Sequence, residues 1–169
     1  MVEALSASSP LNEVLRASLP LPTAALSVRV APGMRVLSLR HLAGGTAAVD
    51  AAVAAHGLTP LPVPGTFCGT DPWLVWAGPA EFLLLSTSST VAEGVRQALA
   101  PGRQALACAL DQSAGFLVLE LLGHGVTELL PHLLDTSAIP QGPDQGIQTR
   151  LMDISAVIMR LETDRVWLV

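Results

Sequence analysis

An aspartate, a serine and a histidine lie close together in the segment LDQSAGFLVLELLGHG, residues 110–125. These residue types form nucleophilic sites, in which a histidine accepts the serine proton and a carboxylate orients the histidine. That chemistry requires Ser113 and His124 to lie within hydrogen-bond reach of each other. The residues between them have the apolar pattern of a strand, which would separate the two side chains by about 20 Å.

Asp111 and Ser113 therefore favour a structural role. Ser113 lacks the G-x-S-x-G surroundings that expose the serine of an α/β-hydrolase. Short polar side chains between two strands commonly bond nearby backbone amides and hold a turn. We predict this role for both residues, and a hydrolase that uses Ser113 is the less favoured alternative.

A second group with chemical potential is the row His124, Glu128 and His132, in which the residues are four apart. A metal ion could use such a row on one helix face. However, each step of four residues drifts by about 40° around a helix, and Pro131 interrupts the pattern. The polar face of an amphipathic helix explains the row equally well, so we do not predict a metal site.

Two glycine pairs, Gly44-Gly45 and Gly123 with Gly125, each precede a predicted helix. Glycine at such a position lets a phosphate approach the helix amides. Neither pair fits G-x-G-x-x-G or a P-loop, and the chain has no lysine to assist. Tight turns between strand and helix are the favoured interpretation.

The elements that must position these residues follow from apolar runs bounded by turn residues. The pattern predicts strands at 24–30, 34–40, 73–78, 81–86, 104–112, 116–122, 147–153, 155–162 and 165–169. It predicts helices at 8–18, 46–57, 90–100 and 126–134. Thr90 and Glu93 are expected to form a capping box, and Pro131 is expected to kink or divide the last helix.

The order of these elements indicates an internal repeat. VLSLR at 36–40 aligns with VLELL at 118–122, and WAGPAEFLLL at 76–85 matches the pattern of RLETDRVWLV at 160–169. Both offsets are about eighty residues. We predict an α+β fold of two weakly similar split β-α-β, ferredoxin-like halves with largely antiparallel sheets.

The predicted boundaries are an N-terminal extension with a short helix at 1–23 and one domain at 24–169. Its halves span about 24–112 and 113–169. The second half lacks the last helix and strand of the first, so it is predicted to be incomplete.

Composition limits the classes of function. Half of the 169 residues are apolar and only 14% are charged, so we expect part of the surface to meet a partner protein. The nine arginines form no basic run, which argues against nucleic acid. Without lysine or tyrosine, a lysine Schiff base and a tyrosine acid are excluded.

The same sequence argues against a membrane or secreted protein. The uncharged stretch 51–70 is broken by three prolines and three glycines, and the N-terminus lacks the basic start of a secretory signal. Cys68 and Cys108 have no C-x-x-C spacing, so we expect free thiols and a cytoplasmic location.

LDQSAGFLVLELLGHGVTELL resembles the D-x-S, strand, G-P, A-x-x-L-L run of folate-binding aminomethyltransferase domains. Together with SPL near the start, WAGPAEFLLL in the middle and QTRLMDISAVIMRL near the end, it resembles the gamma subunits of heterotetrameric sarcosine oxidases. The resemblance covers most of the chain from Ser9. Ala114 and His124 depart from it, where the family often has histidine and proline. The structural motif positions that it marks are Asp111, Ser113, Gly123, Gln148, Thr149 and Arg150.

The resemblance implies a non-catalytic structural subunit of a complex that oxidises sarcosine. FAD, FMN and NAD would be held by larger flavoprotein subunits, and tetrahydrofolate would accept the one-carbon unit there. The resemblance assigns no catalytic, cofactor-binding or metal residue to this chain.

Two further expectations concern assembly. The runner-up function is a free-standing folate-binding or one-carbon-transfer protein, built as a homodimer to complete the fold. In either case, an uncovered sheet would make the isolated chain self-associate or dissolve poorly. Trp167 and Leu168 are the residues expected near a partner contact, which should bury more than about 2,000 Å².

Overall fold

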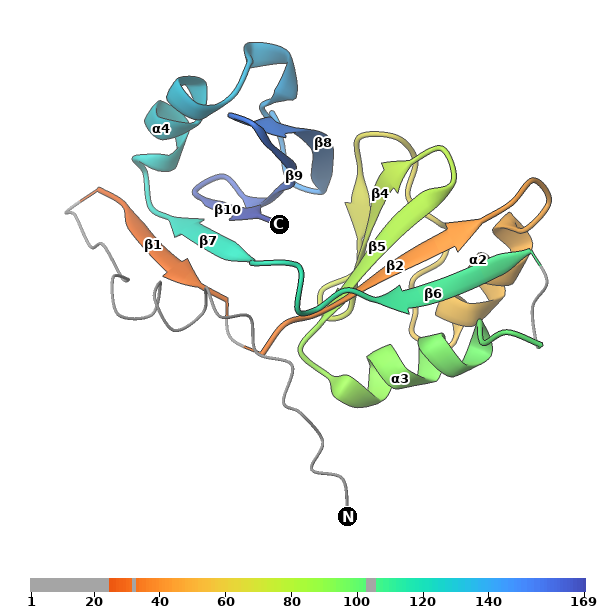
Figure 1. Ribbon diagram of the computed structural model, residues 1–169. Helices are drawn as coiled ribbons and strands as arrows, with labels where there is room; N and C mark the ends of the chain where they lie inside the picture. The colour runs from red at the N-terminus through yellow and green to blue at the C-terminus, as the bar shows by residue number, and fades with distance from the viewer. Residues whose placement is uncertain (1–24, 32, 103–105) are drawn as a thin grey trace.

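Two antiparallel sheets of five strands each form the framework of the protein (Figure 1). This computed structural model describes residues 25–31, 33–102 and 106–169. The predicted N-terminal helix at 8–18 lies outside these residues. The α+β class and the antiparallel sheets predicted from the sequence are confirmed.

The first sheet has the strand order β3-β4-β5-β2-β6. Apolar runs around the Pro79-Ala80 turn form its central hairpin, and the predicted bounds of those two strands agree with the structure. Two helices, Thr46–Ala54 (α2) and Ser89–Ala98 (α3), follow strands of this sheet. Its strands are Arg35–His41 (β2), Phe67–Cys68 (β3), Trp73–Gly78 (β4), Glu81–Ser86 (β5) and Ala107–Asp111 (β6).

The second sheet has the strand order β1-β7-β10-β9-β8. One helix, Val126–Leu133 (α4), and a short 3-10 turn, Thr136–Ala138, connect its strands. Its strands are Ser27–Val30 (β1), Leu119–Leu122 (β7), Gln145–Leu151 (β8), Ile154–Glu162 (β9) and Arg165–Leu168 (β10).

The two sheets repeat one arrangement. In the first, β3, β4 and β5 lead to β2 and then to β6; in the second, β8, β9 and β10 lead to β7 and then to β1. Each of β2 and β7 is followed by a helix, whereas only the first half has a helix after its hairpin. The strand that the second half lacks is supplied by β1, which precedes the first sheet in sequence but pairs with β7.

The core has three layers. The first cluster lies between α2, α3 and the first sheet, and the third lies between α4 and the second sheet. The middle cluster fills the space between the sheets and includes Val75, Leu85, Met159 and Trp167. In it the rings of Trp73 and Trp167 meet edge to face at 4.5 Å, so an aromatic pair joins the two halves.

The expected capping box was wrong, and the expected division of the last helix at Pro131 does not occur. The predicted Thr90 and Glu93 capping box does not form, because α3 begins earlier and the Ser88 hydroxyl accepts the Val91 amide. Pro131 does not divide α4, which runs through it and ends two residues later. Proline removes one backbone hydrogen bond of the helix. Because α4 ends two residues later, almost no helix follows whose direction the proline could change. Among the described residues, no helix has the length and apolar character to cross a membrane.

Candidate functional site

Asp111 and Ser113 join the end of β6 to the start of β2. The Ser113 amide and hydroxyl both donate to Asp111 Oδ1, at 2.9 and 2.6 Å. The same hydroxyl accepts the Val36 amide at 3.0 Å, across 77 positions of sequence. Each of the two side chains thus accepts a hydrogen bond from a backbone amide.

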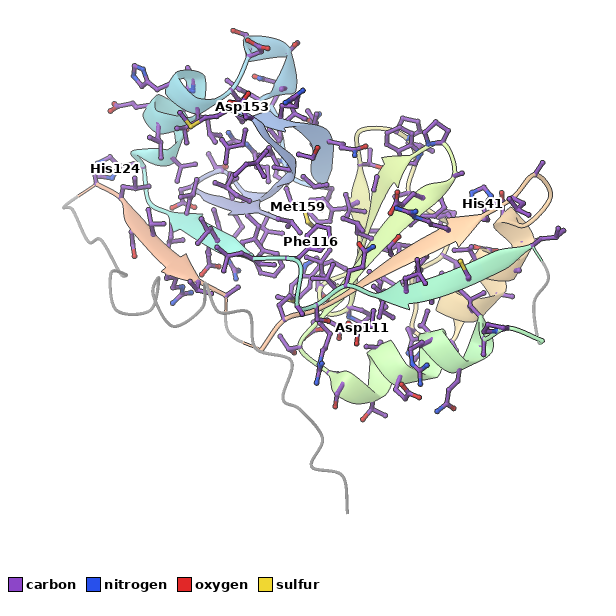
Figure 2. The ribbon with its side chains drawn as sticks, viewed as in Figure 1. His41, Asp111, Phe116, His124, Asp153 and Met159 are labelled. Atoms are coloured by element: carbon purple, nitrogen blue, oxygen red, sulfur yellow. The ribbon has the colours of Figure 1, made fainter. Side chains whose placement is uncertain are left out.

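Asp111 is ionised in this arrangement. Burial raises the pKa of its carboxyl, but the two hydrogen bonds from Ser113 and the charges of Arg35 and Arg96 outweigh that effect and lower it. His124 lies beyond the far end of β7, well away from Asp111 (Figure 2). The strand therefore separates the serine from the histidine, and His124 is not placed to act as a general base for Ser113.

Ser113→Ala should lower the free energy of unfolding by about 1 kcal/mol, because the Val36 amide loses its acceptor. Urea denaturation of the variant and of Ser155→Ala, which alters an exposed serine on β9, measures the difference. The control should change stability by less than about 0.5 kcal/mol. Equal effects of the two changes would show that the Ser113 bonds contribute nothing.

Gly123 shapes the turn between β7 and α4. Its φ is +121°, and a Cβ there would collide with the backbone carbonyl of Ala25. Its amide donates to the Asp164 backbone carbonyl oxygen at 2.8 Å, and the Gly125 amide donates to the Ala25 carbonyl oxygen at 2.9 Å. These amides already have partners within the chain, which agrees with a tight turn rather than a phosphate cradle.

Gln148, Thr149 and Arg150 lie on β8, an edge strand of the second sheet. Gln148 and Arg150 are exposed, and Arg150 comes within 3.8 Å of the Asp153 carboxylate. β8 is not part of the turns that contain Ser113 and Gly123. The structure therefore places the six motif residues in three separate regions and does not bring them into one site.

A buried acid that the sequence analysis did not single out is Glu120 on β7. Arg29 on β1 donates from Nε to one of its carboxylate oxygens. Arg165 Nε on β10 donates to the other oxygen at 2.6 Å, and Trp167 Nε1 donates to that oxygen at 3.2 Å. Three strands of the second sheet are thus joined through one carboxylate, and the signal for it was a lone charge in an apolar strand.

The expectation that Trp167 and Leu168 lie at a partner contact requires correction. Their exposed fractions are 3% and 7%, so both are buried within this chain. Trp167 packs between the sheets and Leu168 packs beneath α4, because adjacent residues of a strand point to opposite faces. β1 pairs with β7 and so covers an edge of the second sheet that was expected to be open.

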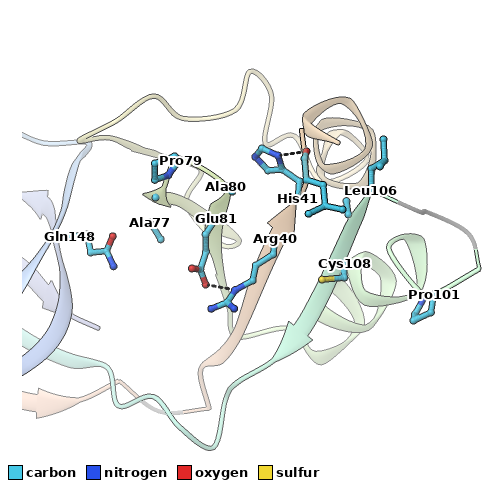
Figure 3. Close-up of a pocket in the computed structure, with 13 residues that line it drawn as sticks. Arg40, His41, Ala77, Pro79, Ala80, Glu81, Pro101, Leu106, Cys108 and Gln148 are labelled. Carbon is cyan, nitrogen blue, oxygen red and sulfur yellow. Dashed lines mark hydrogen bonds and ion pairs between the residues drawn. The ribbon is translucent and has the colours of Figure 1, made fainter. Parts of the chain in front are cut away.

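A cleft opens where the two sheets diverge (Figure 3). Its volume is about 850 Å³. One wall comes from the ends of β2, β5 and β6, and Gln148 of β8 faces it from the second sheet. The apolar part of the lining comprises Leu42, Ala77, Pro79, Ala80, Pro101, Leu106 and Ala107.

The polar groups of this cleft largely satisfy one another. Arg40 Nε lies 3.2 Å from Glu81 Oε1, and the buried Ser38 hydroxyl donates to the same oxygen. His41 Nδ1 lies 3.1 Å from the Leu42 carbonyl oxygen. The arrangement suits binding of an apolar group better than acid–base catalysis, because the Glu81 carboxylate is already engaged by Arg40 and the buried Ser38 hydroxyl and most of the lining is apolar.

The row of His124, Glu128 and His132 does not share one helix. α4 begins at Val126, so His124 precedes it and only Glu128 and His132 lie within it. In the described residues, no group of three histidine, cysteine, aspartate or glutamate side chains is placed to hold a metal ion.

The fold defines an α+β protein made of two related antiparallel halves. Among solved structures, the chain is similar to heterotetrameric sarcosine oxidase from Corynebacterium sp. U-96 in complex with pyrrole 2-carboxylate. The TM-score is 0.76 and the identity 25%, over 98% of this chain and 85% of that chain. The resemblance to a sarcosine oxidase subunit is therefore confirmed. No protein-family model matches the sequence, and no curated protein matches it.

Proposed function

We propose that this chain is a non-catalytic structural subunit of a sarcosine oxidase-type complex. The observation that carries the proposal is the structural similarity to the heterotetrameric enzyme over 98% of the chain. The positions of Asp111, Ser113 and Gly123 support it, since their polar groups bond to backbone and hold turns. The partners would be larger flavoprotein subunits in a cytoplasmic hetero-oligomer.

In this proposal the chemistry belongs to the partner subunits. They would hold FAD, FMN and NAD, oxidise sarcosine, and pass the one-carbon unit to tetrahydrofolate. The present chain would contribute a rigid surface, and its buried Glu120 cluster and inter-sheet core support that role.

The turn between β8 and β9 is the contact surface that we propose for a flavoprotein subunit. Met152 and Ile154 at this turn are 82% and 72% exposed, the two highest values among the large apolar side chains of the described residues. Two adjacent exposed apolar side chains at a hairpin tip are costly in water, and burial by a partner offsets that cost.

Co-expression of a tagged chain with candidate large flavoprotein subunits of a sarcosine oxidase-type complex tests the proposed function. The purified tag fraction should contain those subunits and show flavin absorbance. A monomer that ignores them would refute the proposal. Tight one-site binding of tetrahydrofolate by the isolated chain, near micromolar or about −8 kcal/mol, would instead support a free-standing folate-binding protein.

Changing both Met152 and Ile154 to glutamate should weaken recovery of the flavoprotein subunits at least tenfold, which corresponds to about 1.4 kcal/mol. The charges would enter an interface that otherwise buries apolar side chains. Val63→Glu, at another exposed apolar residue, is the matched control and should leave recovery unchanged. If the double variant and the Val63→Glu control lost recovery equally, or if neither lost any, the contact would lie elsewhere.

A further inference from the structure

β6 forms one edge of the first sheet, and its outer side has no strand partner among the described residues. The Leu42 amide donates to the Leu106 carbonyl at 2.8 Å, and the Gln112 amide donates to Val36 at 2.9 Å. Even-numbered residues of this strand therefore exchange bonds with β2. The backbone groups of Ala107 and Ala109 point away from β2 and present a template for another strand.

Apart from Asp111 at its end, this edge lacks the features with which proteins usually prevent edge pairing. Residues 106–110 have the sequence LACAL, without charge or proline. Leu106 and Leu110 are 43% and 44% exposed, and Cys108 lies between them on the same face, because side chains alternate along a strand. The middle core cluster between the sheets contains no residue of β6, so this face of β6 is not packed into the core between the sheets.

We propose that the β6 edge pairs antiparallel with the β6 edge of a second copy of this chain. The sequence LACAL reads the same in both directions from its cysteine, so a two-fold axis at Cys108 places identical residue types opposite each other. Leu106 then faces Leu110 of the second copy, and Ala107 faces Ala109 of the second copy. The two sheets combine into one of ten strands.

The chemistry of the edge selects this register. The next register that satisfies the outward amides has its axis at Ala109. That register sets Leu106 against Gln112 and places the carboxylate of Asp111 opposite Ala107. Across residues 106–110 the Cys108 axis pairs apolar side chains only, and it places the two cysteines opposite each other in a non-hydrogen-bonded pair.

This register predicts that a disulfide can form between the Cys108 side chains of the two copies. Residues opposite in a non-hydrogen-bonded pair have Cα atoms about 4.5 Å apart, within the range that a disulfide spans. Under a mild oxidant such as copper phenanthroline, the two thiols lose two protons and two electrons to the oxidant and form one S–S bond. The Cys68→Ser chain, which keeps Cys108, should form a covalent dimer that reductant reverses.

The Cys108→Ser chain is the matched control, because Cys68 is likewise a half-buried free thiol in the first sheet. It should remain monomeric on a denaturing gel while still sedimenting as a dimer under native conditions. The proposal would be overturned if the wild-type chain stayed monomeric at about ten times the concentration of the cross-linking assay. It would also be overturned if the cross-link formed through Cys68 instead.

A charge rescue tests the pairing without cysteine chemistry. Leu110→Arg should raise the dimer dissociation constant at least tenfold in sedimentation equilibrium, and adding Leu106→Glu in the same chain should restore it. The rescue is expected because each arginine would then face a glutamate across the axis. Val63→Arg, at an exposed apolar residue outside β6, is the control and should leave the dimer intact. A Leu110→Arg chain that is folded by circular dichroism and dimerises like wild type would refute the proposal.

The dimer is independent of the proposed flavoprotein contact, and the two can fail separately. Dimerisation is measured on the isolated full chain and depends on Leu106 and Leu110. Flavoprotein recovery is measured after co-expression and depends on Met152 and Ile154.

Discussion

Glu120→Ala should lower the free energy of unfolding by about 3 kcal/mol, the largest effect expected of a single charge in this chain. The change leaves Trp167 Nε1 without its acceptor and removes the counter-charge from Arg29 and Arg165. It also removes the carboxylate through which side chains of three neighbouring strands are linked. Both arginines are partly exposed and regain some hydration, so the expected value is at the low end for a broken buried pair.

Urea denaturation of Glu120→Ala and of Glu162→Ala measures this effect. Glu162 also pairs with Arg165, at 3.4 Å, but it is exposed. Its loss should therefore cost less than about 1 kcal/mol. If both variants lost the same stability, burial of the Glu120 carboxylate would not be the source of its contribution.

Glu120 should also make stability depend on acid. Burial raises the pKa of its carboxyl, but the hydrogen bonds from Arg29, Arg165 and Trp167 and the charge of Arg165 outweigh burial and lower it. A lowered folded-state pKa contributes stability that is present above the unfolded value of about 4.3 and is lost as the pH falls through the folded value. Glu120→Gln should therefore lose less stability than wild type on acidification below about pH 4.

Gly123→Ala should cost about 2 kcal/mol or more in unfolding free energy, from two additive sources. A φ of +121° is strained for any residue with a Cβ, and the added methyl would collide with the Ala25 backbone. Relief of the collision requires β1 to move away from the turn that closes β7. The variant should consequently lose both stability and protection of the β1 amides in hydrogen exchange.

Two other glycines separate the sources. Gly33 has a φ of +67° with nothing within 4 Å of an added Cβ, so Gly33→Ala reports backbone strain without collision. Gly142 has equal space and no positive φ, so Gly142→Ala should be near neutral. The expected order of cost is Gly123, then Gly33, then Gly142, and any other order would contradict the explanation.

Local patterns predicted much of this fold. The hairpin of β4 and β5 could be predicted to the residue, because apolar runs and the glycine-proline turn between them are local signals. The turn role of Asp111 and Ser113 followed from their position between two strands. The repeat was visible because both halves place similar apolar runs about eighty residues apart.

Long-range pairing could not be predicted. β1 follows the pattern of any strand, and nothing local indicates that its partner is β7, about ninety positions later, rather than the adjacent β2. The interface expectation for Trp167 failed for the same reason, since its burial depends on that pairing and on Trp73. Glu120 was missed because its arginine partners come from strands distant in sequence.

The position of β10 at the centre of the second sheet has a consequence for synthesis on the ribosome. All strands of the first sheet have been made once residue 111 is translated, so that sheet can form early. The second sheet must wait for residues 165–168, because β10 joins β7 to β9. Until then β1, which is made first, can pair only with β7, and β7 lacks β10 on its other side. A nascent chain arrested between residues 122 and 165 should therefore carry a protected first half beside a protease-sensitive second half.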